Sequence, residues 1–372
     1  MPKAASPHGR QAWTRDRLAA RLPFLRRRAA LTAATRAFFQ SRGYLEVETP
    51  CLVPAPGMEV HLRGFATEYR PHLGIGEETL LWLRTSPELA LKRLLAGGAG
   101  PIFEFARVWR NGEASPNHAP EFTMLEWYAP GLGMAGLMDE AELLLRSVCP
   151  GVVGQGEVTA DLSRPFVRMT MAEAFSRYCR GLDILGTVDV ATGEGSATRL
   201  RAAAARSGLH VSETDSWEDG FFRLMLRYVE PKLGRGQATF LTHWPTPQAA
   251  LARRDPQDGR VALRFELFAA GLELANAFEE LTDPVEQRSR FERDVAARRA
   301  ESGEAGWDVD EDFLAALDYG MPPSSGIALG FDRLAMLASG AAEIEDVLWL
   351  PAIPRTPQPA LAAPPKLLAG PG

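Results

Sequence analysis

The chain of 372 residues has few cysteines, since Cys51, Cys149 and Cys179 are the only three. Their number is odd, they lie far apart in the sequence, and no two of them form a Cys-x-x-Cys pair. A structural zinc site needs closely spaced cysteines, and a disulfide framework needs paired ones. The sequence therefore indicates neither.

Long apolar runs are also missing. No stretch reaches the roughly 18 consecutive apolar residues that a membrane span requires, and no apolar signal-peptide core precedes the first predicted helix. We therefore expect no membrane segment and a cytoplasmic, soluble protein.

An excess of positive charge is absent as well, because 41 Lys and Arg face 47 Asp and Glu, for a net charge of -6. A nucleic-acid-binding protein usually presents a basic surface. The one basic cluster is N-terminal and consists of Arg10, Arg15, Arg17, Arg21, Arg26, Arg27 and Arg28. An arginine-rich start can mimic a transit peptide, but this one runs into an apolar helical pattern, so we interpret it as a solvated helix face.

What the sequence does contain is enough apolar patterning for a substantial core, with 46% hydrophobic residues. Apolar spacing and end signals predict helices over residues 12–43, 86–96, 133–148, 169–230 (with a break at 186–196) and 284–300. Strands are predicted at 44–48, 79–85 and 239–243, hairpins over 103–128 and 261–282, a strand–helix unit over 326–339, and loops at 51–64, 150–165 and 301–312. Because hairpins join many of these strands, we expect an α+β fold, an antiparallel β-sheet flanked by helices.

The first hairpin is the most informative stretch. Its first strand ends at Arg110, and Phe122, Met124, Glu126 and Tyr128 occupy alternate positions of the return strand. Alternate side chains of a strand share a face, so the hairpin offers a cation, an aromatic plate, a carboxylate and a phenol to one surface. That combination suits a site for a nucleotide phosphate, an adenine ring and an aminated substrate.

The second hairpin carries two acids on opposite sides of its predicted turn, Glu266 and Glu273. Two close carboxylates repel unless a cation joins them, and Mg²⁺ bridging ATP phosphates fits such a pair. The alternative is that both lie on a solvated face. Strict alternation puts Asn276 and Glu280 on the face opposite Glu273, so a shared site requires a bulge.

The third element is a strand that enters a helix through Gly330. Glycine lets the backbone approach a ligand closely, the helix N-terminus favours anions, and Arg333 adds a full positive charge in the first turn. This junction suits the distal phosphates of ATP, although an ordinary strand–helix junction is the alternative. Ser86 and Glu88 have two interpretations, a helix cap or contacts to a substrate amine.

Three segments resemble motifs of class II aminoacyl-tRNA synthetases of the lysyl branch. Residues 48–50 resemble motif 1, residues 105–128 motif 2 and residues 326–337 motif 3. The strings LKRLLAGG, HAPEFTMLEWY and LELANAFEELTD are close to lysyl enzymes. EVETPC, LWLRTSPE and GIALGFDRLAML are more similar to a truncated paralogous family, the elongation factor P–(R)-β-lysine ligases.

The resemblance implies a class II fold that is usually a homodimer through motif 1, and the use of ATP and Mg²⁺. It implies activation of (R)-β-lysine as an adenylate and its transfer to a lysine of elongation factor P. We expect residues 1–23 to be a basic extension, 24–350 the catalytic domain and 351–372 a disordered Pro/Ala-rich tail. Because the core begins by about residue 24, we expect no anticodon-binding domain, and the acidic balance also argues against tRNA as a partner.

The resemblance also implies a role for each matching residue. Arg110 and Arg333 would be catalytic. ATP would be bound by Arg110, Asn111, Gly112, His118, Ala119, Phe122, Glu266, Leu267, Gly330 and Arg333. The amino-acid substrate would be bound by Ser86, Pro87, Glu88, Glu126, Tyr128, Glu273, Asn276, Glu280 and Ala328. Mg²⁺ would be held by Glu266 and Glu273.

Ala328 is the sharpest single position, because lysyl-tRNA synthetases usually have glycine there and the ligase family has alanine. The sequence also departs from the family. Motif 2 usually reads Arg-Asn-Glu, whereas Gly112 here moves the acid to Glu113, and Ala119 replaces an asparagine. Two alternatives stay open: a stand-alone lysyl-tRNA synthetase-like enzyme that uses α-lysine or tRNA, and a catalytically silent regulatory paralogue, which Gly112 favours.

Overall fold

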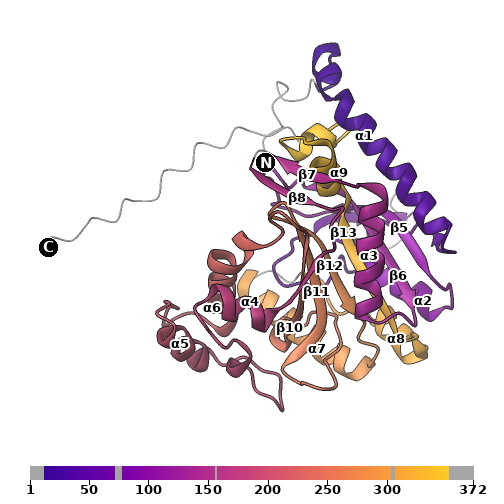
Figure 1. The fold of residues 1–372 in the computed structure, drawn as a ribbon. Helices are drawn as coiled ribbons and strands as arrows, with labels where there is room; N and C mark the ends of the chain where they lie inside the picture. The colour runs from indigo at the N-terminus through magenta and orange to yellow at the C-terminus, as the bar shows by residue number, and fades with distance from the viewer. Residues whose placement is uncertain (1–11, 72–77, 156, 303–305, 352–372) are drawn as a thin grey trace.

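An eight-stranded β-sheet forms the centre of the computed structural model, which describes residues 12–71, 78–155, 157–302 and 306–351 (Figure 1). The strand order is β1 (Leu45–Glu46), β5 (Ile102–Trp109), β6 (Glu121–Pro130), β13 (Ser324–Gly330), β12 (Leu272–Glu279), β11 (Val261–Ala269), β10 (Thr239–Pro245) and β9 (Val167–Thr170). The strands from β5 to β10 pair antiparallel, whereas β1 and β9 pair parallel to their neighbours at the two edges. The predicted α+β fold is confirmed.

Two small sheets lie beside the large one. One contains β2 (Leu52–Val53), β4 (Thr79–Leu83) and β3 (Phe65–Tyr69), and the other is the hairpin of β7 (Val152–Gln155) and β8 (Val158–Asp161). The loop prediction for residues 150–165 was therefore wrong, and so was that for 51–64 at β2. The β7–β8 hairpin depends on Gly154, which has a φ of 109° and packs closely, since a β-carbon there would lie 2.7 Å from that of Ala270.

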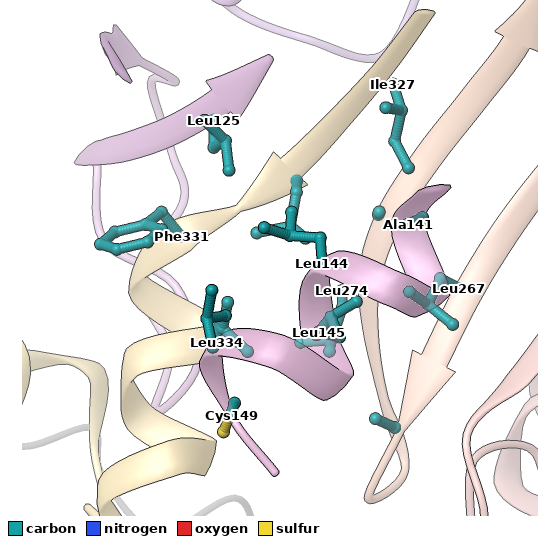
Figure 2. Close-up of a cluster of buried hydrophobic side chains, with 14 of the residues drawn as sticks. Leu125, Ala141, Leu144, Leu145, Cys149, Leu267, Leu274, Ile327, Phe331 and Leu334 are labelled. Atoms are coloured by element: carbon teal, nitrogen blue, oxygen red, sulfur yellow. The ribbon is translucent and has the colours of Figure 1, made fainter. Parts of the chain in front are cut away.

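Three helices cover one face of the large sheet: α1 (Arg15–Gln40), α3 (Met134–Val148) and α9 (Phe331–Ser339). Figure 2 shows Leu144 and Leu145 of α3 and Leu334 of α9 with the strand residues Leu125 and Ile327. The buried side chains of α3 recur at three- and four-residue spacing, which gives the helix one apolar face for this core. With this face filled, the opposite face of the sheet remains for a site.

The other helices form two further groups. The helices α2 (Glu88–Ala96), α7 (Pro284–Ser302) and α8 (Glu311–Gly320) share one cluster, and α4 (Met171–Tyr178), α5 (Ala197–Arg206) and α6 (Trp217–Leu224) share another. Short helical turns lie at Leu185–Thr187, Met225–Val229, Glu230–Lys232, Thr246–Gln248 and Ile344–Val347. None of the described helices is long and apolar enough to cross a membrane.

Helix α1 corrects the interpretation of the basic cluster as a wholly solvated face. Arg28 is buried, contacts the Asp332 carboxylate and donates to Thr123 Oγ1 at 2.9 Å. A buried guanidinium needs such a partner, and here the pair ties α1 to α9. The helix also runs across residues 23 and 24, so the proposed domain boundary there stays a prediction. Residues 352–372 of the predicted tail lie outside the described residues.

Candidate active site

A row of paired residues crosses the open face of the large sheet. Glu266 of β11 pairs with Asn276 of β12, Asn276 with Ala328 of β13, and Ala328 with Glu126 of β6. Directly opposed residues on neighbouring strands share a face of the sheet. The structure therefore brings four predicted site residues, from four strands, side by side.

Glu273 joins this face because β12 contains a bulge. Leu267 pairs with Ala275 whereas Phe268 pairs with Glu273, which leaves Leu274 as an extra residue. Leu274 is buried in the core below the sheet. Glu273 and Asn276 both line the cavity above it. The bulge that a shared site required is present.

A cavity of about 550 Å³ lies over this face, within the range of small-molecule sites. Its lining includes these predicted residues: Ser86, Glu88, Arg110, His118, Ala119, Phe122, Tyr128, Glu273, Asn276, Ala328, Gly330 and Arg333. Seven predicted residues are not part of the lining: Pro87, Asn111, Gly112, Glu126, Glu266, Leu267 and Glu280. Glu126, Glu266 and Glu280 are buried carboxylates, Leu267 belongs to the core, and Asn111 and Gly112 are exposed.

One end of the cavity is cationic. The guanidinium carbon of Arg110 lies 5.3 Å from the ring centre of Phe122. Arg333 donates to the carbonyl oxygen of Glu273 at 2.8 Å and contacts Nε2 of His118. Burial, followed by the charge of Arg333, lowers the pKa of His118, so its neutral form is favoured. Two guanidinium groups and an aromatic ring suit a nucleotide.

Glu113 also lines this end, with Oε1 3.7 Å from Nη1 of Arg110. The acid that Gly112 displaces by one position is therefore still at the cavity.

The other end carries a buried carboxylate. Glu126 lies four residues beyond Phe122 on β6. Because successive strand residues rise about 3.4 Å, its carboxylate is well away from the cationic end. Glu126 is fully buried and accepts hydrogen bonds from Ser86 Oγ at 2.6 Å and Tyr128 Oη at 3.1 Å. Burial, and then the charge of Glu88, raises the pKa of Glu126 to about 8. In the described structure no cation pairs with it.

Lys92 is a site residue that the sequence reasoning missed. Its ammonium lies 2.5 Å from Glu88 Oε1 and 2.5 Å from Glu280 Oε2, and its side chain is 1% exposed. The four-residue spacing from Glu88 to Lys92 on one helix was a sequence signal for the first of these two ion pairs. Burial is the main cause that raises the pKa of Glu280 to about 8 and that of Glu88 above its ordinary value.

Arg264, near the start of β11 in the second hairpin, was also missed. It donates to Glu266 Oε1 at 2.6 Å and to Asn276 Oδ1 at 3.1 Å, and stacks 4.0 Å from the ring centre of Trp244. A guanidinium only donates, so the amide oxygen of Asn276 faces Arg264 and its NH₂ group is left to donate elsewhere. Burial, and then the charge of Glu273, raises the pKa of Glu266 to about 8.

Gly326 leaves room for Tyr128 beside the acidic end. A β-carbon at Gly326 would lie 2.1 Å from Cε1 of Tyr128, closer than real contacts allow. The two residues pair directly across β13 and β6. The glycine is therefore what allows the phenol ring to occupy this position.

We expect the stability of the ligand-free protein to fall as pH rises from about 4.5 to about 8. Glu126, Glu266 and Glu280 have a pKa of about 8, against 4.5 for an ordinary glutamate. In this window the folded protein keeps protons that the unfolded chain has lost, so rising pH favours unfolding. Urea unfolding at several pH values measures this, and Glu126→Gln should show a shallower decline. An equal decline in both proteins would contradict the account of Glu126.

Comparisons with known proteins agree with this geometry. The chain matches the family model of tRNA synthetases class II (D, K and N) over residues 11–354. The elongation factor P–(R)-β-lysine ligase of Klebsiella pneumoniae (strain 342) is 41% identical to it over 329 residues, which cover 88% of this chain and 94% of that protein. The predicted resemblance is confirmed. The chain belongs to the class II tRNA synthetase family and, within it, to the elongation factor P–(R)-β-lysine ligase family.

Proposed function

We propose that this protein activates (R)-β-lysine with ATP and transfers it to a lysine of elongation factor P. The name of the Klebsiella relative supports the choice of substrates. The observation on this chain that carries the proposal is Glu126, a fully buried carboxylate without a cation near a cavity whose other end holds Arg110 and Arg333. An unpaired buried carboxylate is costly, so a site that keeps one suits an ammonium ligand.

ATP would lie at the cationic end. Phe122 and Arg333 would enclose adenine, Arg333 would also reach the γ-phosphate, and Arg110 would bind the α-phosphate together with the substrate carboxylate. The cavity position of these three side chains supports the assignment. Contacts of ATP with Asn111, Gly112, His118, Ala119 and Gly330 are predictions of the same kind. A contact from Leu267 would come from its main chain, because its side chain is in the core.

Glu266 and Glu273 fit a magnesium ion. Burial, and then the charge of Glu273, raises the pKa of Glu266, so a cation between the two carboxylates would be favourable. No cluster of three or more metal-binding side chains occurs among the described residues, which is compatible with magnesium because this ion takes one or two carboxylates and completes its shell with phosphate oxygens and water. When bound, it would neutralise phosphate charge.

The amino-acid substrate would lie at the acidic end. Glu126, Tyr128 and Glu280 would hold the distal ammonium, and Ser86, Pro87 and Glu88 would lie near the second amine. The family resemblance also places Asn276 at this ammonium. Its free NH₂ group instead suits an acceptor, and the substrate carboxylate is the acceptor available.

The proposed reaction has two steps. A carboxylate oxygen of (R)-β-lysine attacks the α-phosphorus of ATP, and pyrophosphate leaves to give the β-lysyl-adenylate. Arg110 and Arg333 lower the barrier by holding the reactants in line and by neutralising charge on the phosphates. The neutral ε-amine of the acceptor lysine then attacks the adenylate carbonyl, AMP leaves, and the nitrogen loses a proton as the amide forms.

The family and the substrates also suggest an oligomeric state and a cellular location. We propose a homodimer that forms through the motif 1 region around Pro50, as the family resemblance implies. We also propose that the reaction takes place in the cytoplasm, where ATP and a translation factor meet. Sedimentation of the purified protein tests the first, and a monomer at working concentrations would overturn it.

We expect Ala328→Gly to improve activation of α-lysine relative to (R)-β-lysine. Ala328 lines the cavity between Asn276 and Glu126, so its methyl group lies where the substrate chain would pass. One methyl group in a pocket is worth roughly 1–3 kcal/mol of discrimination, about tenfold or more in relative kcat/KM. ATP–pyrophosphate exchange with each isomer measures this ratio, and an unchanged ratio would refute the role of the methyl group.

ATP–pyrophosphate exchange also tests the first step of the function itself. Exchange that depends on (R)-β-lysine supports the proposal. Exchange with α-lysine alone would favour the second candidate, a lysyl-tRNA synthetase-like enzyme, for which the match to the tRNA synthetase model is the supporting observation. Absence of exchange with either isomer would indicate a silent paralogue.

A further inference from the structure

Lys92 is a buried ammonium between two carboxylates of the proposed substrate site. Helix α2 brings it to Glu88, four residues earlier, and to Glu280, just beyond the end of β12, at 2.5 Å in both cases. Its ammonium also lies 5.9 Å from the ring centre of Phe278. The two proposed chemical steps do not use this lysine.

One oxygen of Glu280 remains for a ligand. Both oxygens are buried and neither makes a hydrogen bond in the described structure, but Oε2 lies 2.5 Å from the Lys92 ammonium, whereas Oε1 has no ion-pair partner either. A β-carbon on Gly326 would lie 2.7 Å from Oε1, and Gly326 lines the cavity. Glu280 is not part of the lining, so this oxygen lies just beneath the cavity floor, beside Gly326. A buried carboxylate oxygen without a donor is costly unless a ligand supplies one.

The charges at this floor do not cancel by themselves. Glu88, Glu126 and Glu280 contribute three negative charges when they are ionised, and Lys92 contributes one positive charge. The difference is a net charge of -2. A diamino acid brings two ammonium groups, and its carboxylate loses its charge as the adenylate forms. The site therefore balances with one diaminoacyl group.

Two further acids act on Glu88 and Glu126, namely Glu59 and Glu104. Glu59, which raises the pKa of Glu88, is exposed to solvent, where its charge is screened. Glu104, opposite Glu126 on β5, forms a buried ion pair with Arg84 at 2.7 Å. Neither changes the difference at the floor.

We propose that Lys92 is a positioning residue that fixes one oxygen of Glu88 and one of Glu280 and sets the charge of the site to receive two ammonium groups. The inference rests on the proposed function and deepens it. Without Lys92, two buried carboxylates lose their shared cation, so they rotate or take up protons, and the ammonium site loses its geometry. Lys92 does not contact the nucleotide end of the cavity, so that end keeps its geometry.

The test compares Lys92→Met with wild type in ATP–pyrophosphate exchange. We expect the KM for (R)-β-lysine to rise by about tenfold or more, because breaking a buried charge pair commonly costs that much, while the KM for ATP changes by less than about twofold. Arg93→Met is the matched control, since Arg93 pairs with Asp310 and Asp312 outside the cavity. It should leave both KM values near wild type.

The charge-balanced double variant Glu88→Gln/Lys92→Met separates charge from packing. It removes one negative and one positive charge, so it should unfold at a higher temperature than Lys92→Met and recover part of the affinity for β-lysine. The inference would be overturned if the double variant raised the KM for (R)-β-lysine as much as Glu88→Gln and Lys92→Met do together when each is made alone. It would also be overturned by a single variant that raises both KM values equally, or by failure of both variants to fold.

Failure of the proposed function looks different. Wild-type protein that exchanges with no diamino acid would overturn the function and, with it, this inference. Wild-type exchange with an unchanged β-lysine KM in Lys92→Met would overturn the inference alone.

Discussion

Glu126→Gln is expected to lower kcat/KM for (R)-β-lysine by roughly 30-fold or more, because a buried charge that meets the substrate ammonium commonly contributes about 2–5 kcal/mol. Glutamine keeps the size of the side chain and can still accept from Ser86 and donate to Tyr128, the two partners of Glu126. It removes only the negative charge. The KM for ATP should therefore stay within about twofold of wild type.

The pH dependence gives a second readout for this variant. Because the pKa of Glu126 in the free protein is about 8, the carboxylate is protonated over much of the neutral range. Binding an ammonium favours its ionised form, so the affinity of wild type for (R)-β-lysine should increase as pH rises toward about 8. Glu126→Gln should lose this increase.

A matched control is available on the same strand. Glu121→Gln, at the start of β6, removes a partly exposed carboxylate that lies 3.7 Å from Arg107 and outside the cavity. We expect it to keep the wild-type kinetic constants. If Glu126→Gln left the KM for (R)-β-lysine unchanged, the substrate ammonium would bind elsewhere.

Arg110→Ala is expected to lower the rate of pyrophosphate exchange by about a hundred- to a thousandfold, the usual effect of removing one preorganised donor from a reacting centre. Arg110 lies over Phe122, and its Nε is buried without a hydrogen-bond partner in the described structure. Its one ion pair there, to Glu113 at 3.7 Å, is long. The guanidinium is therefore available for a phosphate and a carboxylate. Exchange rates at saturating ATP and β-lysine measure the effect.

Arg107→Ala is the control for this change. Arg107 lies three residues earlier, is half exposed on β5, and does not line the cavity. Its loss should change the exchange rate by less than about twofold, as for most surface substitutions. Arg110→Ala at the wild-type rate would remove Arg110 from the chemistry.

Much of the site could be predicted from local patterns. Alternation within a hairpin put Phe122, Glu126 and Tyr128 on one face, and the structure has them there. The same alternation required a bulge to bring Glu273 and Asn276 together, and β12 contains it at Leu274. Local patterns sufficed because both ends of each hairpin are close in the sequence.

The missed residues depend on distant partners. Lys92 follows the pattern of a solvated helix position, and only its contact with Glu280, far along the chain, makes it a buried charge. Arg28 is similar, because α9 supplies its partner Asp332. A basic side chain on a helix is usually exposed, so neither exception was visible before the elements were packed.

Helix α8 was missed for a different reason. The acid-rich run before it was predicted as a loop up to residue 312, but Asp310 caps the helix by accepting from the amide of Phe313 at 3.0 Å. Glu311 and Asp312 then occupy its first turn, where negative charge is favourable. The acids mark a helix start, which the reading of charge as solvation overlooked.

The most direct test of the central claim is the intact mass of elongation factor P after incubation with this protein, ATP and either (R)-β-lysine or α-lysine. We predict one added lysyl mass, faster with (R)-β-lysine, none without ATP, and much slower addition with Glu126→Gln. The account would be contradicted if elongation factor P stayed unmodified with either isomer while the protein charged tRNA with α-lysine.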